Sequence, residues 1–168
     1  INNIDQFPEK IHFNGFSYDK KNITGTTKFW IKAQEKINKD NKIRFFKTHN
    51  VFGEINKKPF TNNKNSIACI YIIRDPRDVL ISWSHYANIS INDSIDFITN
   101  ESACTNWFKS KNSLLENEIK PKVFLSSWNI HVNSWVNSFK NTHKLILRYE
   151  DLVENKKKIF LKIVKFLE

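Results

Sequence analysis

The chain has 168 residues, of which 40% are apolar and 26% charged, with only three glycines and four prolines. This length predicts a single domain over residues 1–168, and the composition excludes a collagen-like, low-complexity or disulfide-stabilised miniature protein. The net charge of +10 is compatible with a nucleic-acid partner, but 23 lysines, 22 asparagines and 22 isoleucines indicate a compositional bias that accounts for much of it. No apolar run is long enough to span a membrane, so we expect no transmembrane helix.

Short apolar, aromatic and β-branched segments predict three buried parallel strands, at residues 43–48, 67–73 and 145–149. Apolar residues recurring at helical spacing predict helices at residues 27–38, 77–88, 91–99, 122–140 and 153–168. We expect Asp151 to be the N-cap of the last helix. This alternation predicts an α/β fold of three layers, with a central, mainly parallel sheet flanked by helices.

The predicted helix at residues 122–140 carries an aromatic face. Phe124, Trp128, His131 and Trp135 follow one another at spacings of 4, 3 and 4, which places them on one side of a helix. We interpret these side chains as a packed face, and His131 as a core histidine with satisfied hydrogen bonds rather than a ligand.

Arginine is scarce in this chain, with four residues against 23 lysines, and two of the four lie in the turn Arg74-Asp75-Pro76-Arg77-Asp78. A chain that otherwise uses lysine keeps arginine where a planar, two-pronged donor is needed. The other two predicted strands also end in polar residues, Lys47-Thr48-His49 at the first and Tyr149-Glu150-Asp151 at the third. Because ligands bind outside the carboxyl ends of parallel strands, this pattern predicts a crevice for an anionic ligand.

Arg74 and Ser82 are candidate phosphate ligands. Arg74 ends the second predicted strand, and Ser82 lies eight residues further on in the following helix. An arginine with a hydroxyl near a helix start suits a phosphate group. The alternatives are an ion pair of Arg74 with Asp75 or Asp78 and a purely helical role for Ser82. We expect Arg77 and Asp78 to be structural.

Four motifs occur in one order along the chain: Lys-Thr-His at 47–49, Tyr-Ile-Ile-Arg-Asp-Pro-Arg-Asp-Val-Leu-Ile-Ser at 71–82, Trp-x-x-His-Val-x-x-Trp at 128–135 and Arg-Tyr-Glu-Asp-Leu at 148–152. Jointly they resemble the cytosolic-type sulfotransferases that use 3′-phosphoadenosine 5′-phosphosulfate (PAPS). The resemblance runs from about Phe45 to the end of the chain. It implies the P-loop-like fold of that family and transfer of a sulfuryl group from PAPS to an acceptor hydroxyl or amine.

The resemblance also implies roles for single residues. His49 matches the general base that takes the acceptor proton, and Lys47 matches the lysine that steadies the sulfuryl or phosphate oxygens. Arg74 and Ser82 match the residues that hold the 3′-phosphate, and Tyr149 matches a tyrosine near the nucleotide. The reaction implied is an in-line displacement that requires no metal.

Two family segments do not match. The 5′-phosphosulfate loop, with a Pro-Lys-Ser-Gly-Thr-Thr-Trp-like sequence, has no counterpart in its usual context, and neither has the C-terminal Arg-Lys-Gly segment. The stretch Gly25-Thr26-Thr27-Lys28-Phe29-Trp30 is similar in letters but lacks a preceding apolar strand and lies too close to His49. We therefore expect the chain to be a fragment of a sulfotransferase-like domain.

Three other functions are compatible with the sequence. A basic nucleic-acid-binding module, a P-loop kinase and a catalytically inactive sulfotransferase-like fragment are the alternatives, although the chain has no Walker-type loop and no nucleic-acid-binding signature. The expected acceptor is a small molecule or a glycan, and the sequence leaves the oligomeric state open. Cys69 and Cys104 are expected to be free thiols, which fits a cytoplasmic location.

Overall fold

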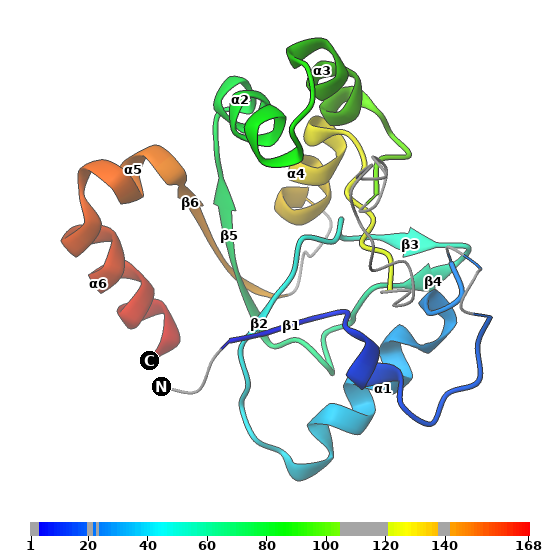
Figure 1. Cartoon of the computed structure of the whole chain (residues 1–168). Coiled ribbons are helices and arrows are strands. Elements are labelled where there is room, and N and C mark those ends of the chain that lie inside the picture. Colours follow the sequence, from blue (N-terminus) through cyan, green and yellow to red (C-terminus); the bar gives the residue numbers. More distant parts are fainter. Residues whose placement is uncertain (1–3, 20–21, 23, 105–120, 138–141) are drawn as a thin grey trace.

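The computed structural model describes residues 4–19, 22, 24–104, 121–137 and 142–168 (Figure 1). Within these residues, short strands alternate with helices. The strands are β1 (Asp5–Gln6), β2 (Phe46–Lys47), β3 (Glu54–Ile55), β4 (Lys58–Pro59), β5 (Ala68–Ile73) and β6 (His143–Arg148). The helices are α1 (Trp30–Ile37), α2 (Pro76–Ala87), α3 (Ile91–Thr99), α4 (Trp128–Asn137), α5 (Tyr149–Glu154) and α6 (Lys156–Leu167).

The parallel pair β5 and β6 is the longest piece of sheet in the described part of the chain. Its register runs from Ala68 opposite His143 to Ile73 opposite Arg148. β1 and β2 also pair in parallel, whereas β3 and β4 form a small antiparallel hairpin. The prediction of an α/β fold with mainly parallel pairing is therefore confirmed.

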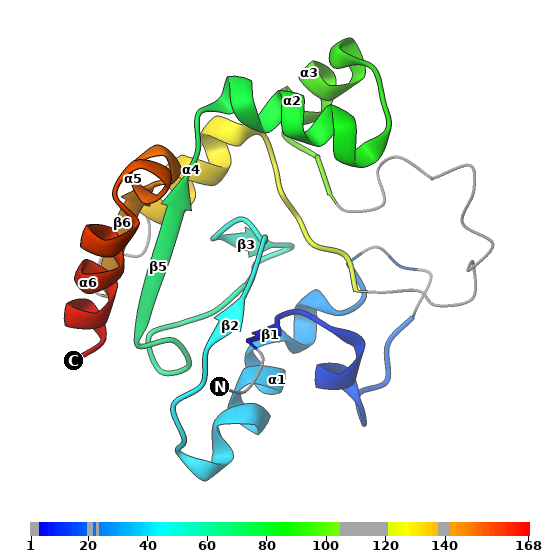
Figure 2. The same ribbon diagram turned by 60° about the vertical axis from the view of Figure 1, so that its left-hand side comes forward.

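Side chains on the two faces of β5 and β6 join different hydrophobic clusters. Ile70, Leu145 and Leu147 pack with residues of α5 and α6 such as Ile159. Tyr71, on the opposite face, packs into the cluster that contains Trp135 of α4 and Trp30 of α1. Figure 1 shows α5 and α6 on one side of the strands and α4 on the other, and Figure 2 shows β5 leading into α2. This gives three layers, as predicted.

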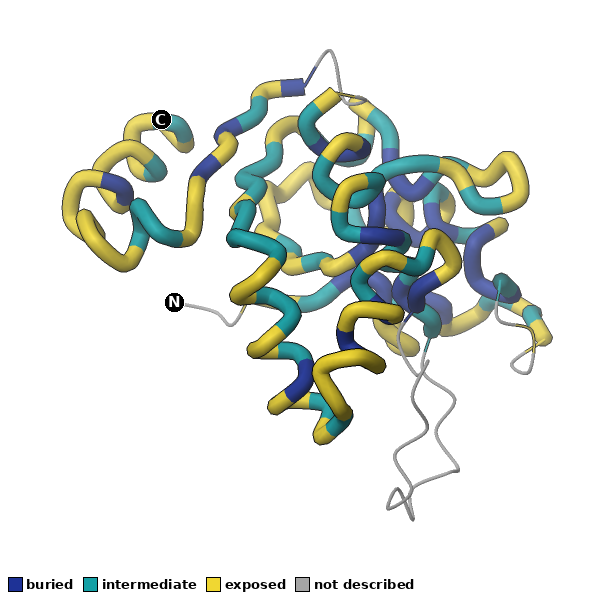
Figure 3. Tube along the Cα trace, turned by 90° about the horizontal axis from the view of Figure 1, so that it is seen from above, coloured by how far each residue is buried: buried dark blue, intermediate teal, exposed yellow. Residues whose placement is uncertain are grey.

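The larger core is built around Trp30, whose side chain is fully buried. Its ring meets Phe60 edge-on at 5.2 Å and Phe124 at 6.0 Å. The neighbouring Gln34 is buried as well, and its amide donates to the carbonyl of Phe60 while its oxygen accepts from the Thr61 hydroxyl. Figure 3 shows the buried positions gathered on one side of the molecule, while the C-terminal helices are largely exposed.

Several predicted boundaries are wrong. The first strand is only Phe46–Lys47, and the third begins at His143 and ends before Tyr149, which starts α5. The helix predicted at 122–140 begins only at Trp128, and its last predicted residues, 138–140, lie outside the described residues. Residues 121–127 are not helical, because the backbone of Phe124 pairs with other segments, including Cys104.

The C-terminal helix is also interrupted, so Asp151 is not its N-cap. Asn155 leaves helical geometry with φ −130° and ψ 48°, and it separates α5 from α6. Asp151 lies inside α5 instead. By contrast, α2 and α3 form where predicted, within one residue at each end.

We predict that Trp30→Ala lowers the free energy of unfolding by about 3–5 kcal/mol, because the substitution leaves a large cavity in a fully buried site. Urea denaturation followed by fluorescence or circular dichroism measures this change. The control is Lys32→Ala on the same helix, since Lys32 is exposed. Equal destabilisation by the two substitutions would contradict the placement of Trp30 in the core.

Candidate functional site

The register of β5 and β6 brings Arg74 and Tyr149 together. Ile73 and Arg148 are opposite each other at the carboxyl ends of the strands, and Arg74 and Tyr149 are the next residues on each. The guanidinium carbon of Arg74 lies 4.7 Å from the centre of the Tyr149 ring, which is a cation–π contact. Two of the predicted site residues therefore share one edge of the sheet.

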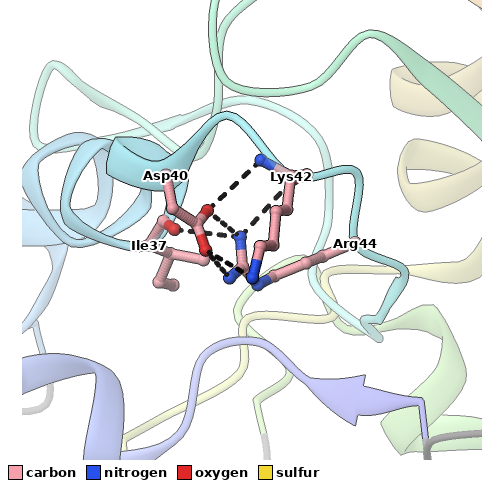
Figure 4. A network of polar contacts seen from close by, with 4 residues as sticks. All are labelled: Ile37, Asp40, Lys42 and Arg44. Atoms are coloured by element: carbon pink, nitrogen blue, oxygen red, sulfur yellow. Dashed lines mark hydrogen bonds and ion pairs between the residues drawn. The ribbon is translucent and has the colours of Figure 1, made fainter.

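The other three arginines have carboxylate partners. Arg44 makes a two-pronged pair with Asp40, and the same guanidinium also contacts the carbonyls of Ile37 and Lys42 (Figure 4). Arg148 lies 3.6 Å from a carboxylate oxygen of Glu150. These contacts give both arginines a structural explanation.

Arg77 is also accounted for. Its Nε and Nη2 donate to the two carboxylate oxygens of Asp75 at 3.0 and 2.6 Å, and its backbone N–H donates to Asp75 as the N-cap of α2. The expectation that Arg77 is structural agrees with these contacts. The side-chain hydrogen bonds from Arg77, followed by the backbone one, lower the pKa of Asp75 to about 2.

Arg74 is the arginine without a carboxylate among the described residues. The alternative that it pairs with Asp75 or Asp78 is therefore wrong, since Asp75 is held by Arg77. The Nε of Arg74 is buried and has no hydrogen-bond partner in the described part of the chain. A buried donor without an acceptor is costly, so an acceptor brought by a ligand gains binding free energy at this place.

Glu150 ties the two strand ends together. One carboxylate oxygen accepts the backbone N–H of Asp75 at 3.0 Å, across from the turn that follows β5. That hydrogen bond is the main cause of a lowered pKa at Glu150. We did not predict this contact from sequence, although an acidic residue directly after a strand end was the available signal.

Lys47 and His49 lie at the end of β2 with their side chains exposed. Within the described residues, neither the Lys47 ammonium nor the His49 ring makes a hydrogen bond or an ion pair. Nearby protein atoms partly desolvate the His49 ring, and this effect together with the Lys47 charge lowers the pKa of His49 below 6.5. At neutral pH the imidazole is therefore uncharged and able to accept a proton.

The backbone after His49 is held by side chains of α4. The indole N–H of Trp135 donates to the carbonyl of Asn50 at 3.0 Å, and the hydroxyl of Ser134 accepts from the N–H of Phe52 at 3.1 Å. His131 contacts the carbonyl of His49 through Nε2 at 3.2 Å. The interpretation of a packed helix face is correct for His131 and Trp135, which also make hydrogen bonds that the spacing did not reveal, whereas Phe124 lies before the helix and not on its face.

The extended segment before α4 supports the same loop. Asn50 is buried, and its side-chain oxygen accepts the N–H of Phe124 at 2.9 Å. The N–H of Val51 in turn donates to the carbonyl of Phe124 at 2.6 Å. These contacts hold the backbone that directly follows His49.

Ser82 is not joined to Arg74 by any contact that the structure records. It lies exposed in the second turn of α2, and its hydroxyl makes no hydrogen bond to a described residue. The phosphate-binding role of Ser82 remains a prediction.

The stretch from Gly25 to Trp30 is a packing segment. Thr26 and Thr27 are buried, and the Thr27 hydroxyl donates to the carbonyl of Thr24. A Cβ on Gly25 would lie 2.5 Å from the carbonyl oxygen of Asp19, so this glycine permits a close backbone approach. The Thr27 hydroxyl is thus already engaged within the chain.

Cys69 and Cys104 are both free thiols, as expected. Among the described residues, no group of three or more histidine, cysteine or acidic side chains is arranged to hold a metal ion. No helix in the described ranges combines the length and apolar character needed to cross a membrane.

These features are those of an α/β protein in which an arginine without a carboxylate partner among the described residues lies at the carboxyl ends of two parallel strands. A family model of the sulfotransferase domain matches residues 10–168. The chain therefore belongs to the sulfotransferase family.

Individual relatives agree with this family. The chain is 31% identical to the amine sulfotransferase of Oryctolagus cuniculus over 114 residues, which is 66% of this chain and 32% of the relative. It is 32% identical to sulfotransferase 1B1 of Canis lupus familiaris over 135 residues, 80% of this chain and 40% of the relative. The crystal structure of mouse sulfotransferase SULT7A1 complexed with PAP (3′-phosphoadenosine 5′-phosphate) superposes with a TM-score of 0.51 at 21% identity, over 78% of this chain and 43% of that one. The fold is thus the P-loop-like fold of sulfotransferases, and the chain spans less than half the length of these proteins.

We predict that Asp75→Asn destabilises the chain at pH 6 and that the difference from wild type shrinks as the pH falls to 3. The folded-state pKa of Asp75 lies near 2, below its ordinary 3.8, so the charged pair with Arg77 stabilises the fold above about pH 4 and is lost as the pH falls through the folded-state value. The amide oxygen of asparagine can still cap α2, while the substitution removes the charge and one of the two oxygens that accept from Arg77.

Thermal unfolding at several pH values measures this difference. Asp96→Asn is the control, since Asp96 is exposed on α3 and its carboxylate has no partner in the described part of the chain. A difference in thermal stability between Asp75→Asn and wild type that does not change with pH would contradict the assigned ion pair.

Proposed function

We propose that this chain carries acceptor-side and nucleotide-binding residues of a PAPS-dependent sulfotransferase. In the proposed reaction, the acceptor oxygen or nitrogen forms a bond to the sulfur, and the bond between the sulfur and the phosphate oxygen of PAPS breaks. PAP leaves, and the acceptor proton passes to His49. Membership of the sulfotransferase family and the similarity to a structure complexed with PAP support this proposal.

The observation that carries the proposal is the state of Arg74. It is stacked on Tyr149 at the carboxyl ends of β5 and β6, keeps a buried donor without a partner, and has no carboxylate neighbour among the described residues. A guanidinium held in this way is suited to a phosphate, which offers several acceptor oxygens. We assign Arg74 to the 3′-phosphate of PAPS, with Tyr149 orienting the guanidinium and Ser82 as a further phosphate ligand.

His49 and Lys47 are proposed to act on the sulfuryl group and its acceptor. The uncharged imidazole of His49 is the form that a general base needs. Among the described residues, no side chain makes a hydrogen bond to this ring. The Lys47 ammonium is close enough to lower the pKa of His49, and it would stabilise charge that develops on the sulfuryl and bridging oxygens.

We propose a small molecule as the acceptor, in keeping with the named relatives, with a glycan as the alternative. The nucleic-acid-binding hypothesis is not favoured, because a family match accounts for the chain and the basic charge follows its lysine-rich composition. That residues 1–168 form a single domain also stays a prediction.

We predict that the chain binds PAP at least tenfold more tightly than 5′-AMP, since the two differ by the 3′-phosphate and a hydrogen bond to a charged group contributes about 1.5–3 kcal/mol. Titration calorimetry on the folded chain measures both affinities. Arg74→Ala should abolish the preference, and Arg77→Ala should keep it because Arg77 is committed to Asp75. Equal binding of the two nucleotides, or equal loss in both variants, would contradict the role of Arg74.

We predict that His49→Asn lowers sulfuryl transfer by about 10²–10⁴-fold, the usual contribution of a general base, and leaves PAP affinity unchanged. Release of PAP in the presence of PAPS and a simple phenol or primary amine measures the rate. His85→Asn, an exposed position on α2, is the control. Because the pKa of His49 is lowered, the acid limb of the wild-type profile should lie below pH 6.5. Retained turnover in His49→Asn would exclude His49 as the base.

A further inference from the structure

His131 lies between the half-buried phenol of Tyr71 and the backbone of His49. Its Nδ1 is 2.8 Å from the hydroxyl oxygen of Tyr71, and its Nε2 is 3.2 Å from the carbonyl oxygen of His49. The rings of His131 and Tyr71 are also stacked, 5.8 Å apart and tilted by 26°. One imidazole thus connects β5 to the loop after β2.

For a neutral imidazole, only one arrangement of hydrogens satisfies both contacts of the ring. A carbonyl oxygen accepts and never donates, so Nε2 of His131 must carry the proton. In the neutral imidazole Nδ1 is then an acceptor, and the Tyr71 hydroxyl must donate to it. Burial lowers the pKa of His131 and raises the pKa of Tyr71 to about 12, so both groups are in the required state at neutral pH.

The peptide between His49 and Asn50 is held at both ends. Its carbonyl accepts from His131, and its N–H donates to the Thr48 hydroxyl at 3.0 Å. The Thr48 contact is local, whereas His131 is 82 residues away in sequence. His131 is therefore the contact that fixes this peptide relative to the sheet, and the peptide plane sets the direction in which the His49 side chain leaves the backbone.

We propose that His131, as the neutral tautomer protonated on Nε2, is a positioning residue that orients His49 through its carbonyl, and that Tyr71 selects this tautomer by donating to Nδ1. The role in catalysis rests on the proposed function, because it matters for transfer only if His49 is the base. The tautomer and its effect on His49 do not depend on transfer.

A matched pair of substitutions separates the two contacts of the ring. The amide nitrogen of glutamine reaches about as far as Nε2, so His131→Gln retains the donor to the His49 carbonyl. The amide oxygen of asparagine lies near the place of Nδ1, so His131→Asn retains the acceptor for Tyr71 and removes the donor. We expect His131→Asn to lower kcat about tenfold with an unchanged KM for PAPS, and His131→Gln to stay near wild type.

Nitrogen-15 NMR of the imidazoles tests the same assignment without turnover. In the wild-type chain, the His131 signals should be those of the tautomer protonated on Nε2, and Tyr71→Phe should shift the population toward the other tautomer. The His49 signals and titration midpoint should change in His131→Asn and remain unchanged in His131→Gln. His85→Asn serves as the control and should change neither set of signals.

The outcomes distinguish this inference from the proposed function. If the wild-type chain transfers no sulfuryl group, the proposed function fails and the NMR data alone decide the positioning role. A proton on Nδ1 of His131 in the wild-type chain would overturn the inference. So would an equal effect of the asparagine and glutamine variants on His49, whatever the rate of transfer.

Discussion

The register of the parallel strands β5 and β6 is the constraint on which the site depends. Because both strands run in one direction and end at paired residues, the residues that follow them emerge at the same edge, and Arg74 meets Tyr149 there. Parallel strands are buried on both faces in α/β folds, and here the two faces serve different neighbours. One faces α5 and α6, while the other places Tyr71 against α4. A shift of register by one residue would separate the arginine from the tyrosine and turn Tyr71 away from His131.

The contacts of the four arginines show what each of them does in this lysine-rich chain. Arg44, Arg77 and Arg148 each contact a carboxylate within four residues in sequence, so their planar geometry serves local structure. Arg74 has an aromatic ring in that position instead, which holds the guanidinium without neutralising its charge. Membership of the sulfotransferase family agrees with an anion-binding role for this edge of the sheet.

The elements that the sequence predicted well are those that depend on residues close together in the chain. The apolar run at 67–73 and the Pro-initiated helix after it depend on neighbouring residues, and both formed close to the expected bounds. The meeting of Arg74 and Tyr149 followed from a general rule about strand ends. The errors came from distant partners: Phe124 is extended because Asn50 and Val51, more than 70 residues earlier, bind its backbone. The Tyr71–His131 contact likewise depends on how α4 crosses the sheet, which periodicity does not encode.

The two consecutive peptides after His49 have another consequence. Each has its carbonyl and its N–H engaged, by His131 and Thr48 in the first and by Trp135 and Phe124 in the second. A loop tied in this way has lost most of its conformational entropy on folding, so that a ligand arriving beside it would not have to supply the free energy for ordering it. The entropy of this loop is instead lost during folding, when α4 packs against the sheet and its side chains bind the loop backbone.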